Sequence, residues 1–400
     1  MRVSEPGPFV VADVACAYDG GVADADELLD RYRVLNCWWD AVAKAGAKVV
    51  VVQRFHRNAV VRRGQVEFHM VTDDGPPGPS ARFWGARMVR AVRGLAPDVV
   101  HVDGLVFPAM VAHLRLALPR RTAIVVQDHG GSERSPGARS WPKRLFYAAG
   151  LRAADGFLFT SRDQAEPWRS AGILGKGARI DEVAEGSTDL AAPTHGSSSL
   201  EAALPGRPAL LWVGRLNANK DPLTVLRGFE GAARALPASA LTLVFREDDL
   251  IDEVRAFIAR SELLRGRVHL RGTIPHDALP SLYAAADLFV LGSHSEGSGY
   301  ALIEALSFGV TPVVTDIPSF RKLTDGGRLG ELFAPGDADT LARALVRVAG
   351  SDLAARRPAV RAHFETALAW DVIGRRALDV YRSLARERAA TSCPSLRAGA

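Results

Sequence analysis

The feature that most constrains the fold of this 400-residue chain is an alternation of short apolar segments with longer helical patterns. In the first half the short segments are continuously apolar rather than alternating apolar with polar. Such runs are typical of strands in a parallel sheet that is covered by helices on both faces. We expect strands at 9–15, 49–53, 99–102, 124–127, 156–160 and 180–183, separated by helices at 31–45, 81–94, 107–116, 141–153 and 162–171.

The second half repeats this pattern. Its expected strands are 209–213, 241–245, 267–271, 288–291, 311–315 and 330–333, and its expected helices are 222–235, 251–261, 279–286, 300–307 and 338–348. The chain is therefore predicted to be an α/β protein with two tandem doubly wound, Rossmann-like domains. Ligands of such domains bind at the carboxyl ends of the strands, so we expect the two domains to face a cleft.

Composition along the chain gives the expected domain boundaries. Residues 1–190 form the first domain, and the Pro-, Gly- and Ser-rich segment 191–208 is the predicted linker. Residues 209–368 form the second domain. A helix is predicted at 369–388, where it could pack back on the first domain, and the small, polar residues 389–400 are expected to be a disordered tail.

The charge pattern narrows the classes of partner. The net charge of +5 suits nucleic acid, a membrane surface or small anionic ligands. The arginines are scattered without a basic run, so we expect no nucleic-acid partner, and only six of the 50 basic residues are lysines.

The same reading predicts where the protein works. No segment approaches the roughly 18 apolar residues of a membrane-spanning helix, and the N-terminus lacks a secretory signal. Three cysteines without a CxxC pair give no disulfide framework. We expect a cytoplasmic protein, with a peripheral position at the inner face of the membrane left open although no basic amphipathic helix indicates it.

Several well-known motifs are absent from the sequence. It contains no GxxxxGK[ST] phosphate loop, no GxGxxG turn after the first strand, no HExxH and no GxSxG. These absences argue against a P-loop enzyme, a nicotinamide dehydrogenase and a serine hydrolase. They also lead us to expect neither a metal site nor a cofactor.

A first informative segment follows the strand at 209–213. The strand leads to Gly214, two cations follow at Arg215 and Lys220, and Pro222 suits the first turn of a helix. Cations in such a loop, beside a helix N-terminus, make a good anion site. Taken alone, the segment fits a solvated loop equally well.

A second segment runs from Leu291 into a glycine-rich turn and then a helix. Backbone N–H groups around Ser298, Gly299, Tyr300 and Ala301 could hold a phosphate at the helix start. Glu296 and Glu304 could bracket a ligand roughly 10 Å long, about the size of a nucleotide diphosphate carrying a sugar. The alternative is that both glutamates only favour the helix dipole.

The spacing Glu296-x7-Glu304, with Val213-Gly214-Arg215-Leu216 and Lys220 upstream, resembles the retaining nucleotide-sugar glycosyltransferases of the GT-B fold, family four. Further similar segments occur in the family's order at 98–102, 154–161, 185–189, 284–290 and 311–314. The resemblance covers most of the chain.

The resemblance implies roles for individual residues. Arg215 and Lys220 would hold the diphosphate and neutralise its charge, Glu304 would bind the ribose hydroxyls, and Glu296 would face the donor sugar. His129 would reach the donor sugar from the first domain. The remaining donor-binding positions would be Gly214, Ser298, Gly299, Tyr300 and Ala301.

Three places depart from the family pattern. Gly20-Gly21 precedes an acidic stretch at 23–30, and Asp103 stands where many relatives have a second histidine. We assign Gly20, Gly21 and Asp103 to the acceptor side. The segment 246–249 replaces a glycine-rich turn of the family, so the resemblance does not indicate how the base of the nucleotide is bound. Trp38 and Trp39, in the predicted helix at 31–45, are expected in the core or at a domain contact rather than against a sugar.

The expected function is retaining transfer of a sugar from a nucleotide-diphosphate sugar to a hydroxyl acceptor by front-face displacement without metal. The first domain would bind the acceptor, which could be a glycan, a lipid-linked or a small molecule, and the second domain the donor. Two alternatives stay open: a GT-B epimerase or phosphorylase, and a non-catalytic nucleotide-sugar-binding protein. The donor sugar, the base, the linkage and the oligomeric state are left undecided.

Overall fold

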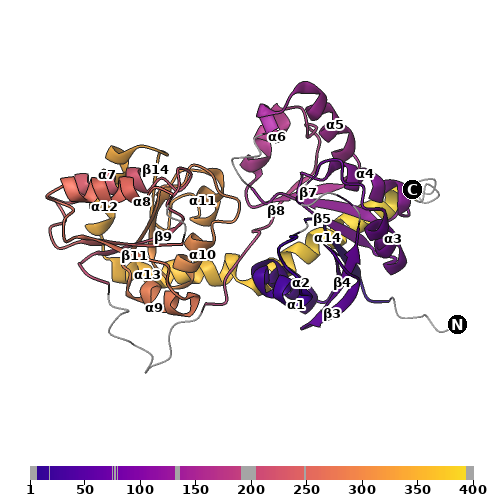
Figure 1. The fold of residues 1–400 in the computed structure, drawn as a ribbon, viewed down its shortest axis with the longest axis horizontal. Helices are drawn as coiled ribbons and strands as arrows, with labels where there is room; N and C mark the ends of the chain where they lie inside the picture. The colour runs from indigo at the N-terminus through magenta and orange to yellow at the C-terminus, as the bar shows by residue number, and fades with distance from the viewer. Residues whose placement is uncertain are drawn as a thin grey trace, which may run out of the picture. The chain divides into compact units, whose positions relative to one another are not determined.

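The structure, a computed structural model, describes residues 7–17, 19–73, 75, 78, 80–130, 136–190, 204–246 and 249–392. These residues form two compact units (Figure 1). The first unit contains the described residues up to Gly186 and those from Trp370 onward, and the second runs from Ser187 to Ala369. Most of the predicted linker, residues 191–203, lies outside the described part of the chain.

The described residues of the first unit form an eight-stranded sheet in the order β3-β4-β2-β1-β5-β6-β7-β8. All neighbouring strands are parallel except β3 and β4. The order reverses at β1 and β5, where ligands bind in open α/β sheets. The strands are β1 (Val10–Ala15), β2 (Lys48–Phe55), β3 (Ala59–Arg63), β4 (Val66–Thr72), β5 (Val99–Asp103), β6 (Ala123–Gln127), β7 (Gly156–Phe159) and β8 (Ile180–Glu182).

The antiparallel pair β3–β4 is the main element that the predicted strands miss. In β4 the side chains of Val66, Phe68 and Met70 are buried, whereas Glu67 and His69 between them are half-exposed. This period of two marks a strand with one buried face, unlike the continuous apolar runs that identified the central strands.

Helices pack around this sheet. In place of the single helix predicted at 31–45, the structure has two helices, α1 (Ala25–Arg31) and α2 (Arg33–Lys44). Helix α1 begins before residue 31 because Asp24 caps it, accepting a hydrogen bond from the Asp26 N–H at 2.8 Å. The other α-helices described in this unit are α3 (Ala86–Leu95), α4 (Pro108–Ala117), α5 (Trp141–Leu151), α6 (Glu166–Ser170) and α14 (Trp370–Ser392).

The second unit has an all-parallel sheet whose described strands follow the order β11-β10-β9-β12-β13-β14. This is the 3-2-1-4-5-6 order of the Rossmann fold, and its reversal lies between β9 and β12. The strands are β9 (Ala209–Gly214), β10 (Ala240–Phe245), β11 (Val268–Gly272), β12 (Leu288–Leu291), β13 (Thr311–Thr315) and β14 (Glu331–Phe333).

The predicted helices of the second unit are present within a few residues of their expected ends. Two more helices, α11 and α13, were not predicted, because α11 is only six residues long and α13 contains Pro358. The described α-helices are α7 (Pro222–Ala232), α8 (Ile251–Arg260), α9 (Leu279–Ala285), α10 (Tyr300–Ser307), α11 (Pro318–Leu323), α12 (Ala338–Ala349) and α13 (Leu353–His363).

Strand alternation divides the core of the first unit into two layers. Val100 and Val102 belong to the layer on one face of β5, whereas His101 lies on the other face against Trp38 and Trp39. Both tryptophans are 3% exposed, so the prediction that they pack in the core is confirmed.

Helix α14 joins the first unit although it follows the whole second unit in the chain. It packs along α2 so closely that a Cβ atom on Gly374 would lie 2.3 Å from the Ala41 carbonyl oxygen, which explains glycine at this position. The helix extends to Ser392, so the predicted disordered tail is wrong for residues 389–392, and residues 393–400 lie outside the described residues.

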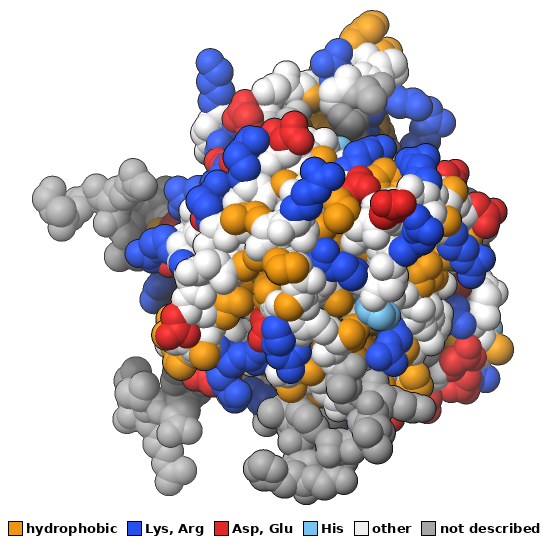
Figure 2. All heavy atoms as spheres, turned by 90° about the vertical axis from the view of Figure 1, so that its left-hand side faces the viewer, with side chains coloured by type: hydrophobic (Ala, Val, Ile, Leu, Met, Phe, Trp, Pro, Cys, Tyr) orange, Lys and Arg blue, Asp and Glu red, His pale blue; other side chains and the backbone are white. Residues whose placement is uncertain are grey.

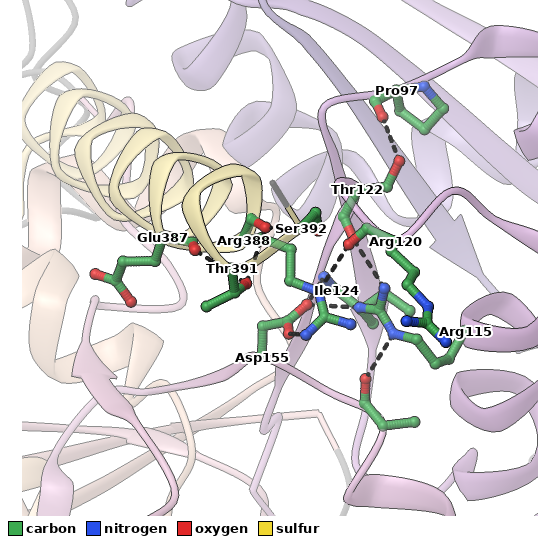
Figure 3. A network of polar contacts seen from close by, with 11 residues as sticks. Pro97, Arg115, Arg120, Thr122, Ile124, Asp155, Glu387, Arg388, Thr391 and Ser392 are labelled. Atoms are coloured by element: carbon green, nitrogen blue, oxygen red, sulfur yellow. Dashed lines mark hydrogen bonds and ion pairs between the residues drawn. The ribbon is translucent and has the colours of Figure 1, made fainter. Parts of the chain in front are cut away.

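An ionic network attaches the end of α14 to the first sheet (Figure 3). The Arg388 guanidinium donates to the Arg120 carbonyl at 2.8 Å and pairs with Asp155 at 3.3 Å. Asp155 also accepts from Arg115 at 2.6 Å and from the Ile124 N–H at 2.8 Å. These contacts keep the last turns of the helix ordered.

The Lys and Arg side chains do not form one basic patch on the face drawn in Figure 2, where they are dispersed among apolar and acidic side chains. Within the described residues, no helix combines the length and the apolar character that crossing a bilayer requires.

Candidate functional site

The two informative segments of the second unit meet at the carboxyl ends of β9 and β12. The His294 N–H donates to the Asn219 carbonyl at 2.8 Å, and the Asn219 amide donates to the Ser295 carbonyl at 3.0 Å. The His294 ring also contacts Asp221 at 3.1 Å. These hydrogen bonds join the loop after β9 to the loop after β12 at the reversal of strand order.

Lys220 and Glu296 form an ion pair in this arrangement, with the ammonium group in contact with Oε1. The side chains are 14% and 12% exposed, respectively, so the pair is largely shielded from water. The Lys220 N–H donates to the Asn217 side chain at 3.1 Å, which fixes the loop that carries the ammonium group. Two residues 76 positions apart in sequence thus lie together, as the predicted site requires.

Helix α10 begins at this same edge. Gly299 precedes it with φ of 66°, a left-handed conformation that favours glycine, and a Cβ there would come within 3.0 Å of the Phe320 ring. Ser298 is buried, and Tyr300 and Ala301 form the first turn. The N–H groups of such a turn and the helix dipole favour an anion.

Glu304 lies one turn further along α10 and is held by a tyrosine. The Tyr283 hydroxyl donates to Glu304 Oε2 at 2.8 Å, and its fully buried ring stacks on Phe308. Burial, together with the nearby Glu304 carboxylate, raises the pKa of Tyr283 well above its ordinary value, so the phenol keeps its proton. No sequence pattern indicated this role, since a tyrosine inside α9 is typical of an ordinary core residue.

The other predicted cation and its glycine lie at the start of the same loop. Gly214 ends β9 and Arg215 follows it as an exposed residue. The Leu216 carbonyl accepts from the Leu250 N–H at 2.9 Å, which anchors the loop at the start of α8. Of the neighbouring acidic segment, Glu247 and Asp248 lie outside the described residues.

In the first unit, the structure brings His129 and Asp103 together. His129 Nε2 lies 3.3 Å from Asp103 Oδ1, and Nδ1 lies 3.4 Å from Glu185 Oε1. Burial lowers the pKa of His129, but the hydrogen bonds and charges of these two carboxylates outweigh it and raise the pKa well above its ordinary value. Glu185 belonged to a family-like segment but was not predicted as a site residue.

Behind Asp103 lies a buried polar group that was not predicted. Asp13 and His101 are neighbours in the register of β1 and β5. Burial, and then the Asp103 carboxylate, raises the pKa of Asp13 well above its ordinary value. His101 Nδ1 contacts the Tyr381 hydroxyl of α14 at 2.8 Å. Two signals could have revealed this group, an aspartate inside the otherwise apolar strand VVADVA and a histidine inside the strand VVHVD.

Gly20 and Gly21 lie in the turn that follows β1, at the edge of the sheet where Asp103 ends β5. The Gly21 N–H donates to Asp19 at 3.0 Å, and Arg31 holds the same carboxylate at 2.9 Å. The turn is therefore fixed by local contacts. After His129, the described residues continue only to Gly130, and Gly131 lies outside them.

Two family models match the chain. The model "Glycosyltransferase Family 4" matches residues 39–179, and "Glycosyl transferases group 1" matches residues 207–351, so together they span most of both units.

Among the curated relatives is the GDP-mannose:cellobiosyl-diphosphopolyprenol alpha-mannosyltransferase of Xanthomonas campestris. It is 27% identical over 337 residues, which are 79% of this chain and 82% of the relative.

Solved structures share the fold. The sucrose-phosphate synthase of Thermosynechococcus elongatus superposes with a TM-score of 0.65 at 19% identity, covering 95% of this chain and all of that one. An Anabaena protein solved with UDP and glucose gives a TM-score of 0.64 at 18% identity and covers 94% of this chain and 100% of its own.

Both units thus have the parallel α/β architecture of these structures, and each is matched by a model of the same kind of enzyme. The chain belongs to the family-4 glycosyltransferases of the GT-B fold and is an enzyme that transfers glycosyl groups.

Proposed function

We propose that the chain transfers a sugar, with retention of anomeric configuration, from a nucleotide-diphosphate sugar to a hydroxyl acceptor. The observation that carries this proposal is the contact of Lys220 with Glu296 after β9 and β12, with the Tyr283-held Glu304 on the helix α10 that follows. One cation, two carboxylates and a helix N-terminus suit a ligand that has a diphosphate between two hydroxyl-bearing sugars.

Each of these groups has a proposed part in the reaction. Lys220 and Arg215, with the first-turn amides of α10, bind the diphosphate and neutralise the charge that grows on it as the sugar–phosphate bond breaks. Glu304 accepts hydrogen bonds from the ribose. Glu296 faces the hydroxyls of the donor sugar. Backbone of Gly214, Ser298, Gly299, Tyr300 and Ala301 lines the donor.

Retention follows from attack on the face that the phosphate leaves. A leaving phosphate oxygen takes the acceptor proton while the acceptor oxygen bonds to the anomeric carbon, so no enzyme-bound sugar is formed. Positive charge from Lys220, Arg215 and α10 replaces a divalent ion at the diphosphate. Activity should therefore survive brief EDTA treatment, and complete loss with rescue by Mg²⁺ would contradict this assignment.

We assign the acceptor to the first unit. His129, fixed between Asp103 and Glu185, presents an imidazole at the carboxyl ends of β5 and β6, where the Gly20–Gly21 turn also lies. We propose that His129 contacts the donor sugar and that Asp103 and the turn contact the acceptor.

A lipid-linked acceptor is the class that we favour. The Xanthomonas campestris relative is named for a cellobiosyl-diphosphopolyprenol substrate. In addition, helix α5 of this chain exposes Trp141, Leu145 and Phe146 by 71%, 59% and 41% of their surface, respectively, beside the exposed cations Lys143 and Arg152. An apolar stripe with flanking cations suits the surface of an anionic bilayer.

Membrane contact can be tested by sedimentation with phosphatidylglycerol vesicles. Wild-type protein and Trp84→Ala, which removes an exposed tryptophan elsewhere in this unit, should pellet with the vesicles, whereas Trp141→Ala/Phe146→Ala should stay in the supernatant. Equal sedimentation of all three proteins would show that Trp141 and Phe146 of α5 do not mediate membrane binding.

The transferase proposal is tested in two steps. Thermal-shift screening against GDP- and UDP-sugars identifies the donor, and NMR of the product formed with that donor gives the anomeric configuration. Transfer with retention supports the proposal. Release of sugar phosphate or an epimerised nucleotide sugar favours the epimerase or phosphorylase alternative, and binding without turnover favours a binding protein.

A further inference from the structure

We propose that Asp13, His101 and Asp103 bind a divalent transition-metal cation of the zinc or manganese class inside the first unit. The site lies in the first unit and shares Asp103 with the proposed acceptor contacts. Metal content and sugar transfer are measured separately, so either assignment can fail without the other. Its role is to hold β1, β5 and α14 together.

The sheet brings the three side chains to one place. Asp13 and His101 lie opposite each other on the parallel strands β1 and β5, and Asp103 follows His101 by two residues, so it points to the same face. The ligand atoms of the three residues lie within 4.8 Å of one another. Two carboxylates and one imidazole form an oxygen–nitrogen donor set that suits zinc or manganese.

One distance matches metal coordination. His101 Nε2 and Asp103 Oδ1 are 3.4 Å apart, and Nε2 has no well-formed hydrogen bond, although the Asp103 and Gln127 side chains lend the imidazole weak support. Two ligands that are each about 2.0–2.1 Å from a tetrahedral zinc ion lie about 3.3–3.4 Å from one another. The observed spacing therefore leaves room for an ion bound to both atoms.

The Asp13 carboxylate lacks well-formed partners at this position, whereas Asp103 Oδ1 also lies 3.3 Å from His129 Nε2. Asp13 is fully buried, and neither carboxylate oxygen has a well-formed hydrogen bond, although the Trp39 side chain and the Val14 backbone near it lend weak support. In the part of the chain that the structure describes, Asp13 pairs with no lysine or arginine, whereas Asp103 has the imidazoles of His101 and His129 beside it. Burying an uncompensated carboxylate is costly. Protonation of Asp13 would neutralise that carboxyl group alone, whereas a bound cation would coordinate Asp13, His101 and Asp103 together.

The surroundings orient the imidazole as a ligand. The Tyr381 hydroxyl lies 2.8 Å from His101 Nδ1, and the Trp39 ring packs edge-on against the imidazole. With Nδ1–H donated to the hydroxyl, the Nε2 lone pair faces the carboxylates. Partners of this kind normally fix metal-bound histidines. Because Tyr381 belongs to α14, the ion would couple the C-terminal helix to the sheet.

Metal analysis of the full-length protein tests the proposal. After gel filtration, wild-type protein should carry about one equivalent of zinc or manganese per chain. Asp13→Asn should carry almost none, whereas the matched control Asp40→Asn, which removes a carboxylate that pairs with Lys44 on α2, should retain it. Circular dichroism checks that each variant is folded.

A second measurement does not depend on any variant. EDTA-treated wild-type protein titrated with Co²⁺ should develop visible d–d absorption, lose it when Zn²⁺ is added, and gain several degrees in Tm with Zn²⁺. Absence of metal in purified protein together with no response to Co²⁺ or Zn²⁺ would overturn the proposal. An infrared band of a protonated carboxyl that Asp13→Asn removes, seen in metal-free protein at full stability, would also overturn it and assign a proton to Asp13.

Discussion

Replacing Lys220 with alanine removes the ammonium group from the shielded pair with Glu296. A charged hydrogen bond contributes about 1.5–3 kcal/mol, which corresponds to about 10- to 150-fold in Kd. The substitution also leaves the Glu296 carboxylate without its cation beside the diphosphate. At about 5 Å and an effective dielectric constant of about 20, two unit charges interact by about 3 kcal/mol. Nucleoside-diphosphate affinity should therefore fall at least about tenfold.

Isothermal titration calorimetry with GDP and UDP measures this loss. The control is Lys176→Ala, which removes one of the chain's few other lysines from an exposed loop of the first unit and should leave Kd unchanged. Lys220→Ala/Glu296→Gln should recover part of the affinity, because the repulsive carboxylate is neutralised. Unchanged Kd in a folded Lys220→Ala protein would refute the assignment of Lys220 to the diphosphate.

Three further predictions concern the contacts described above. Glu296→Gln should abolish sugar transfer while nucleoside-diphosphate binding is preserved or tightened, since Lys220 loses its competing anion; full activity in a product assay would contradict the role of Glu296. Tyr283→Phe removes the hydrogen bond that orients Glu304, worth about 1 kcal/mol, so the KM for the donor should rise about fivefold with kcat little changed. An unchanged KM would mean that Glu304 needs no such support. Asp155→Ala removes the acceptor of the Ile124 N–H and the carboxylate that pairs with Arg115 and Arg388, although Arg115 keeps the Ala153 and Thr122 carbonyls. The substitution should lower the free energy of unfolding by about 2–3 kcal/mol in urea denaturation, whereas a loss below about 0.5 kcal/mol would show that the network of Figure 3 is not stabilising.

The proposed donor site at the carboxyl ends of β9 and β12 was predictable because the local sequence motifs and the sheet topology agree there. A buried strand ending in Gly214 and another ending before Gly292 place their loops on one edge once both strands are parallel. The family resemblance implied that Lys220 and Glu296 share a site, this rule agrees with that expectation, and the structure places the two side chains in contact.

The residues that prediction missed act through contacts that only tertiary packing creates. Tyr381 reaches His101 across 280 residues because α14 returns to the first unit, and nothing in the sequence of α14 indicates that partner. Tyr283 is likewise an unremarkable helix residue until α9 packs on α10. The β3–β4 hairpin is a different case, since its alternation of buried and half-exposed side chains was visible in the sequence.

The most direct test of the central claim is a crystal structure of the protein with a bound nucleoside diphosphate. The diphosphate should lie within hydrogen-bond distance of Lys220 Nζ and the first-turn amides of α10, with the ribose hydroxyls on Glu304. A diphosphate bound away from the ends of β9 and β12 would contradict the proposed donor site.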